Sequence, residues 1–105
     1  FENVKKDWTM RVSELLRQQR NEILKLASQH GARNVRVFGS AARGEAGTDS
    51  DIDFLVELEP DRTLFDLGAL VMDLQDLLDR KIDIVTDDSI YWLLRRKILK
   101  EAVSL

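Results

Sequence analysis

The chain has 105 residues, of which 44% are hydrophobic and 33% are charged, and its formal net charge is −3. These values are typical of one folded domain rather than a disordered segment, and the acidic balance disfavours unspecific binding to DNA or RNA. The absence of cysteine excludes disulfides and thiolate metal sites, and the sequence shows neither a membrane span nor a signal peptide, so we expect a cytoplasmic location.

The first predicted element is a helix over residues 10–30. Apolar residues recur near helical spacing at Val12, Leu15, Leu16, Ile23, Leu26 and Ala27. Gly31 is placed to end this helix, and we expect His30, the only histidine, to cap it. A zinc site or a Ser-His-Asp triad is therefore disfavoured. Residues 1–9 start without Met, and we interpret them as a leader or an added segment before a single domain spanning 10–105.

Two strands follow, separated by a loop. Residues 34–38 alternate and predict a strand that Gly39 and Ser40 break. Ser40 can cap a short helix over residues 41–43, which Gly44 would end. The stretch 44–50 is a loop by composition, and residues 51–58 predict the second strand. Alternation places its side chains on two faces, with Ile52, Phe54 and Val56 on one and Asp51, Asp53, Leu55 and Glu57 on the other.

The remaining elements alternate between helix and strand. Pro60 and Asp61 predict a turn, and residues 63–78 predict an amphipathic helix with a stripe of Leu64, Leu67, Val71, Leu74 and Leu78. Residues 81–86 predict a third strand. Asp87 or Asp88 can cap a last helix that carries Leu93, Leu94 and Ile98. This order predicts an α/β (α+β) domain with helices packed against a small mixed sheet.

Three carboxylates interrupt the predicted strands. Asp51, Asp53 and Asp83 are the polar exceptions among apolar neighbours, and paired strands would bring all three to one face. Carboxylate oxygens suit Mg²⁺, which keeps substrate phosphates among its ligands. Two such ions would stabilise the attacking and leaving oxygens of a displacement at phosphorus. The alternative for Asp51 and Asp53 is a solvated edge strand or a helix-capping pair, and Asp83 could instead pair with Lys81 or Arg80 on the surface.

The Gly39-Ser40 pair supplies a complementary phosphate site. Gly lets the backbone approach a phosphate closely, and a helix N-terminus directs N–H groups at an anion. The Ser40 hydroxyl adds a donor, and Arg43 could reach a phosphate. An ordinary surface arginine paired with Glu45 is the competing interpretation of Arg43. The acidic positions Asp73, Asp76 and Asp79 instead indicate the solvent-facing side of a helix.

The combined pattern resembles the polymerase-β-like nucleotidyltransferase superfamily. Gly39-Ser40, ten intervening residues, Asp51-Ile52-Asp53 and then Asp83 is similar to its smallest members, the minimal nucleotidyltransferases (MNT proteins). The resemblance implies that Gly39 and Ser40 hold nucleotide phosphates, that Asp51, Asp53 and Asp83 bind metal, and that Asp83 helps to activate the acceptor hydroxyl. Ser50 and Arg43 also match the sequence pattern of the minimal nucleotidyltransferases.

The resemblance further implies a partner. MNT proteins occur beside small helical HEPN proteins as toxin–antitoxin pairs, and some transfer AMP from ATP to a tyrosine of the HEPN toxin. We therefore expect a Mg²⁺-dependent nucleotidyltransferase acting as an antitoxin, with ATP or another NTP as substrate and a possible hetero-oligomer. One alternative is a binding module that neutralises its partner by occlusion. Another is transfer onto a small molecule such as an aminoglycoside.

Overall fold

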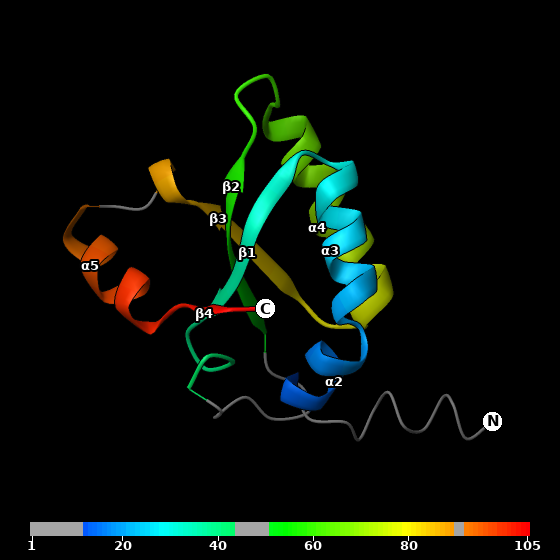
Figure 1. Ribbon diagram of the computed structural model, residues 1–105, viewed down its shortest axis with the longest axis horizontal. Helices are drawn as coiled ribbons and strands as arrows, with labels where there is room; N and C mark the ends of the chain where they lie inside the picture. Colours follow the sequence, from blue (N-terminus) through cyan, green and yellow to red (C-terminus); the bar gives the residue numbers. More distant parts are fainter. Residues whose placement is uncertain (1–11, 44–50, 90–91) are drawn as a thin grey trace.

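The computed structural model describes residues 12–43, 51–89 and 92–105, with only the backbone of residues 89 and 92–95 (Figure 1). Its elements are α2 (Val12–Gln18), α3 (Arg20–Gln29), β1 (Ala32–Phe38), β2 (Ile52–Leu58), α4 (Leu64–Leu78), β3 (Ile82–Thr86), the 3-10 helix η1 (Asp87–Ser89), α5 (Trp92–Glu101) and β4 (Val103–Ser104). The predicted mixed α/β fold is confirmed. Residues 1–9, Met10 and the loop 44–50 lie outside the described residues.

The four strands form one mixed sheet in the order β3-β2-β1-β4. β2 runs antiparallel to β1 and parallel to β3, and the parallel pair is joined through α4, as a parallel connection requires. Figure 1 shows α3 and α4 on one side of the sheet and α5 on the other. β4, which the sequence did not predict, adds two residues antiparallel to β1. None of the described helices has the length and apolarity that crossing a membrane requires.

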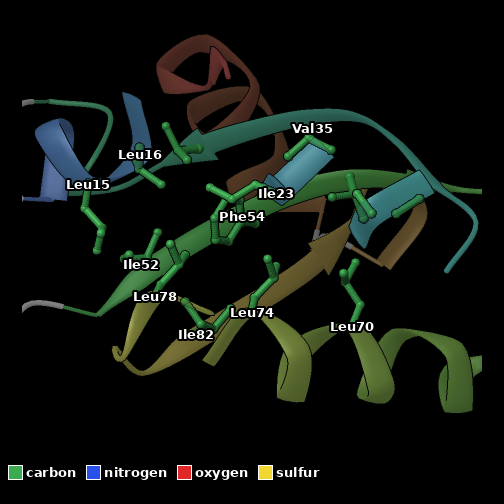
Figure 2. Close-up of a cluster of buried hydrophobic side chains, with 14 of the residues drawn as sticks. Leu15, Leu16, Ile23, Val35, Ile52, Phe54, Leu70, Leu74, Leu78 and Ile82 are labelled. Carbon is green, nitrogen blue, oxygen red and sulfur yellow. The ribbon is translucent and has the colours of Figure 1, made fainter. Parts of the chain in front are cut away.

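The hydrophobic core lies between one face of the sheet and the helices α2, α3 and α4. Figure 2 shows side chains from β1, β2 and β3 pointing towards the helices, among them Val35, Phe54 and Ile82. On the central strand, Ile52, Phe54, Leu55 and Val56 are all buried. Leu55 leaves β2 on the opposite face, so this strand is apolar on both sides, and only Asp53 and Glu57 interrupt it.

The predicted first helix is two helices. Gln19 separates α2 from α3 in a turn, with φ −98° and ψ 9°. Two backbone hydrogen bonds of 2.9 Å span this turn. The Gln19 N–H donates to the Leu15 carbonyl and the Ile23 N–H donates to the Gln19 carbonyl, so the chain keeps a helical path across it. The six residues 17–22 are all polar, so no apolar side chain anchors this turn to the core. Gly31 ends α3 as predicted, with φ +76°.

The apolar stripe of α4 is largely the predicted one, because Leu67 and Val71 pack against the core and Leu74 and Leu78 are buried, but Leu70 takes the place of Leu64. Leu70, Leu74 and Leu78 are buried, whereas Leu64 is 80% exposed. The buried residues form an i, i+4 row, and Leu64 lies about 120° around the helix from Leu70. Thr63 caps α4 in a capping box, in which its side chain accepts from the Phe65 N–H and the Asp66 carboxylate accepts from the Thr63 N–H.

The end of β3 also differs from expectation. Asp87 or Asp88 is predicted to cap the last helix, but both lie in the 3-10 helix η1. Their carboxylates have other partners, because Asp87 pairs with Arg36 at 2.7 Å and Asp88 accepts from the Thr86 hydroxyl at 2.7 Å.

Candidate active site

Asp53 and Asp83 lie side by side on neighbouring strands. They are register partners in the parallel pair of β2 and β3, so both side chains leave the same face of the sheet. This face is opposite to Ile52, Phe54 and Ile82, which point into the core. Asp53 is half-buried and Asp83 is exposed. The fold therefore brings two of the three predicted carboxylates together on the face that α3 and α4 do not cover.

Asp51 lies immediately before β2 and is exposed. The next residue, Ile52, donates its N–H to the carbonyl of Lys81 at 3.0 Å, which ties the start of β2 to the residue before β3. Because Asp51 precedes Asp53 by two positions, the alternation of an extended chain directs it to the same side. All three carboxylates thus lie at or just before the N-terminal ends of β2 and β3.

Electrostatic crowding is evident at Asp53. Burial raises its pKa above the usual value, and the nearby carboxylates of Asp83 and then Asp51 raise it further. Each of these effects disfavours the ionised form, because it removes water from the charge or places a like charge beside it. A cation at this edge would relieve the repulsion and hold Asp53 ionised.

The donor set suits a hard cation, although the carboxylates do not enclose one. Across residues 12–43, 51–89 and 92–105, no three acidic, histidine or cysteine side chains gather closely enough to form a ready metal site. Oxygen ligands from carboxylates nevertheless match the preference of Mg²⁺, which commonly takes one or two protein carboxylates and completes its shell with phosphates and water. Asp53 and Asp83 offer two carboxylates of this kind on one face of the sheet.

Gly39 brings the chain after β1 against Asp53. Phe38, the last residue of β1, is the register partner of Asp53, and Gly39 follows with φ +69°. A Cβ at position 39 would lie 2.7 Å from Oδ2 of Asp53, closer than side-chain carbon atoms normally come. Glycine therefore lets the backbone turn this close to the carboxylate, and the turn that contains Gly39 lies directly against Asp53.

The predicted short helix after Ser40 is a turn. Within residues 39–43 one bond of helical type forms, from the Arg43 N–H to the Gly39 carbonyl at 3.2 Å. Gly39 closes this turn with a left-handed conformation instead of entering a helix. The phosphate site predicted at a helix N-terminus is therefore a turn preceding the undescribed residues 44–50, with Ser40 half-buried within it.

Arg43 pairs with a residue that the sequence did not suggest. Its guanidinium lies 3.2 Å from Oε1 of Glu101 at the end of α5. Glu45 and Ser50 lie outside the described residues. The pair joins the turn after β1 to the C-terminal helix, and Arg43 keeps 44% of its side chain exposed.

Sequence reasoning missed Arg36. This residue lies on β1 opposite Leu55, and its guanidinium donates to Oδ1 of Asp87 at 2.7 Å while only 13% of its side chain is exposed. The pair fastens the end of β3 to β1 on the same face as Asp53. The available signal was the alternation of residues 34–38, which separates Arg36 from the core-facing Val35 and Val37.

Comparison with known proteins identifies the family. The nucleotidyltransferase domain family matches residues 16–105, so the chain belongs to it and is a transferase. The candidate protein adenylyltransferase MJ0435 of Methanocaldococcus jannaschii is 38% identical over 96 residues, which cover 91% of this chain and 99% of that protein.

Two solved structures share the fold. One, described as a candidate minimal nucleotidyltransferase, has a TM-score of 0.80 and 47% identity, and the match covers 89% of this chain and 95% of that one. Another is MntA in a toxin–antitoxin complex, with a TM-score of 0.68 and 25% identity over 82% of this chain and 70% of that one.

Proposed function

We propose that this protein transfers AMP from ATP to a hydroxyl group, with Mg²⁺, and that the acceptor is a tyrosine of a HEPN toxin for which it is the antitoxin. The observation that carries the proposal is the placement of Asp53 and Asp83 in register, with Gly39 directly against Asp53. The protein adenylyltransferase name of the M. jannaschii relative supports AMP as the transferred group.

The reaction is a displacement at phosphorus. The acceptor oxygen attacks the α-phosphorus of ATP, the bond from the α-phosphorus to the bridging oxygen breaks, and pyrophosphate leaves with that oxygen. The acceptor hydroxyl loses its proton as the new bond forms. Catalysis of this kind depends on positioning and charge neutralisation more than on covalent chemistry by the protein.

Each site residue has a distinct part in the proposal. Asp51, Asp53 and Asp83 would hold Mg²⁺ with the nucleotide phosphates, and the bound metal would neutralise phosphate charge and polarise the α-phosphorus. Asp83, which is exposed beside Asp53, would favour loss of the acceptor proton. Gly39 and Ser40 offer backbone and hydroxyl donors to the triphosphate. We assign Arg43 a supporting phosphate contact, which requires it to leave Glu101.

The acceptor would approach from the face of the sheet that α3 and α4 leave uncovered, the side on which α5 also lies. Asp83 is exposed there, and α3 and α4 occupy the other face. The fold shared with MntA, solved in a toxin–antitoxin complex, supports a helical HEPN protein as the partner that presents the hydroxyl. In this arrangement the cytoplasmic pair forms a hetero-oligomer in which the acceptor lies at the edge formed by the starts of β2 and β3.

The test is transfer of label from α-labelled ATP to the protein encoded by the neighbouring gene, in the presence of Mg²⁺. We expect labelling by the native protein and its loss in Asp53→Asn. The matched control is Asp76→Asn, which removes the same charge from the exposed side of α4, away from the site. Equal labelling by native protein and Asp53→Asn would overturn the assignment of the site.

The non-catalytic alternative predicts a different result in cells. If the protein acts by occlusion alone, Asp53→Asn will bind the toxin and protect against it as well as the native protein does. If transfer is the mechanism, the same variant will bind the toxin and fail to protect. Co-purification of the variant with its partner separates loss of chemistry from loss of binding.

A further inference from the structure

A fourth carboxylate, that of Glu101, reaches the turn after β1 from the far end of the chain. β4 runs antiparallel to β1, with Val37 opposite Val103 (Figure 1). Glu101 lies two residues before Val103 and Gly39 lies two residues after Val37, so the strand pairing brings the end of α5 to the Gly39 turn. There the Arg43 guanidinium lies 3.2 Å from Oε1 of Glu101. The contact therefore follows from the way the chain end returns to the sheet.

Glu101 occupies an unfavourable position for a carboxylate. It is the last residue of α5, where the carbonyl groups of a helix carry partial negative charge. Only 26% of its side chain is exposed, so water solvates the charge incompletely. Within the part of the chain that the structure describes, Arg43 is the only cation within 4.0 Å of this carboxylate. Arg43 therefore stabilises the last turn of α5 while the two side chains are paired.

Arg43 is also within the turn that lies against the candidate metal site. Its backbone N–H donates to the Gly39 carbonyl at 3.2 Å, and Gly39 lies directly against Asp53. Because 44% of the Arg43 side chain is exposed, it can change partner without breaking a buried contact. A triphosphate bound beside Asp53 would carry several negative charges against the single charge of Glu101, and a hydrogen bond between arginine and phosphate is a strong one.

We propose that Glu101 competes with the ATP triphosphate for Arg43, so that the Arg43–Glu101 pair is a latch that ATP opens when it binds. The inference rests on the proposed function, because it takes the turn at Gly39 as the triphosphate site. A partly exposed ion pair is weak, so the latch lowers the affinity for ATP only a few-fold. Glu101 is thus a positioning residue, since it acts through Arg43 and contacts neither the metal nor the phosphates.

Opening the latch affects α5, which lies on the side of the sheet that α3 and α4 leave uncovered (Figure 1). Once Arg43 binds phosphate, the charge of Glu101 remains at the negative end of the helix without its partner. The last turn of α5 is closed by the Ala102 N–H, which donates to the Ile98 carbonyl at 2.9 Å. ATP binding should therefore loosen this turn, and the Ala102 amide reports the change.

Calorimetric binding of ATP with Mg²⁺ to this chain alone tests the competition without the acceptor. We expect Glu101→Gln to bind ATP about two- to five-fold more tightly than the native protein, the range that exposed ion pairs allow. In an Arg43→Gln background the same substitution should have no effect, because Glu101 acts through Arg43. The matched control is Glu59→Gln, which removes the same charge from a partly exposed pair with Arg62, 3.3 Å apart, beyond the opposite end of β2. This control should leave the affinity for ATP unchanged.

Failure of the latch can be told apart from failure of the proposed function. If the native protein binds ATP as tightly as Glu101→Gln or more tightly, the latch is wrong and the proposed function stands. An equal gain from Glu101→Gln with and without Arg43 would indicate simple charge repulsion and also overturn the latch. A native protein that does not bind ATP with Mg²⁺ would overturn both. Hydrogen exchange of the Ala102 amide should become faster with ATP in the native protein, and an unchanged rate would mean that Arg43 keeps Glu101 in the bound state, which contradicts the latch.

Discussion

Gly39 and Asp53 are so close that a Cβ on the first would lie 2.7 Å from Oδ2 of the second. The contact joins the turn after β1 to the start of β2, and it exists because Phe38 and Asp53 are register partners. The carboxylate of Asp53 can therefore lie against this turn only because residue 39 has no side chain.

Gly39→Ala should impair both folding and transfer. The left-handed backbone at φ +69° costs a residue with a Cβ about 1–2 kcal/mol, and the new methyl group must displace Asp53. Urea unfolding measures the first effect, and labelling of the partner from ATP measures the second. The matched control is Gly68→Ala, where a Cβ has open space and the gain in helix propensity should stabilise the monomer by about 0.5–1 kcal/mol.

Asp53→Asn should make the protein inactive and more stable. The pKa of Asp53 is raised by burial and by the charges of Asp83 and Asp51, so the folded state binds the proton more tightly than the unfolded state does. Stability associated with this proton is present below the ordinary pKa of 3.8 and is lost as pH rises through the raised value. Removing the charge therefore raises the melting temperature at pH 7.

The size of this gain should depend on pH and on Mg²⁺. Well below the ordinary pKa of 3.8 the Asp53 carboxyl is protonated in both the folded and the unfolded state, and the advantage of Asp53→Asn should disappear. Mg²⁺ should stabilise the native protein at pH 7 and have less effect on the variant, because the cation offsets the repulsion that asparagine has already removed. Equal stabilisation of both proteins by Mg²⁺ would contradict a metal site at Asp53.

Much of this arrangement follows from local sequence patterns. Alternation in residues 51–58 and 81–86 predicted that Asp53 and Asp83 would share a face, and the parallel pairing of β2 with β3 places them in register. The positive φ of Gly39 is the backbone conformation that glycine adopts readily in a turn, here the turn after β1. These features depend on the alternation of side chains within one strand and on short connections between neighbouring elements. Both can be recognised in a single sequence.

Other features depend on partners far along the chain. The Arg36–Asp87 pair joins residues 51 positions apart, and β4 forms only because the chain end returns to β1. The exposure of Leu64 and the burial of Leu70 also escaped prediction, because the helical period allowed either leucine and packing against β3 and α3 selected Leu70 together with Leu74 and Leu78. Local periodicity cannot rank such alternatives, since they differ only in tertiary contacts.

The capping box of α4 should make stability depend on the ionisation of Asp66. Its pKa is lowered, first by the hydrogen bond from the Thr63 backbone N–H and also by the hydrogen bond and charge of Arg62. The stability that it contributes is present above the ordinary pKa of 3.8 and is lost as pH falls through the lowered value. Asp66→Asn should therefore lower the melting temperature at pH 7 and match the native protein near pH 2. A constant difference across this range would contradict a charge-dependent cap.

The Arg36–Asp87 ion pair should contribute more to stability than other ion pairs of the sheet. Its atoms are 2.7 Å apart, with 13% of Arg36 and 27% of Asp87 exposed, so water screens it little. A double-mutant cycle with Arg36→Gln and Asp87→Asn, measured by urea unfolding, should give a coupling of about 1–3 kcal/mol. The control cycle is Arg33→Gln with Glu57→Gln, a pair separated by 4.0 Å with 63% and 42% exposure, for which about 0–1 kcal/mol is expected. Equal coupling in the two cycles would mean that Arg36 and Asp87 are as well hydrated as a surface pair, and that the end of β3 is held to β1 by the backbone and by packing alone.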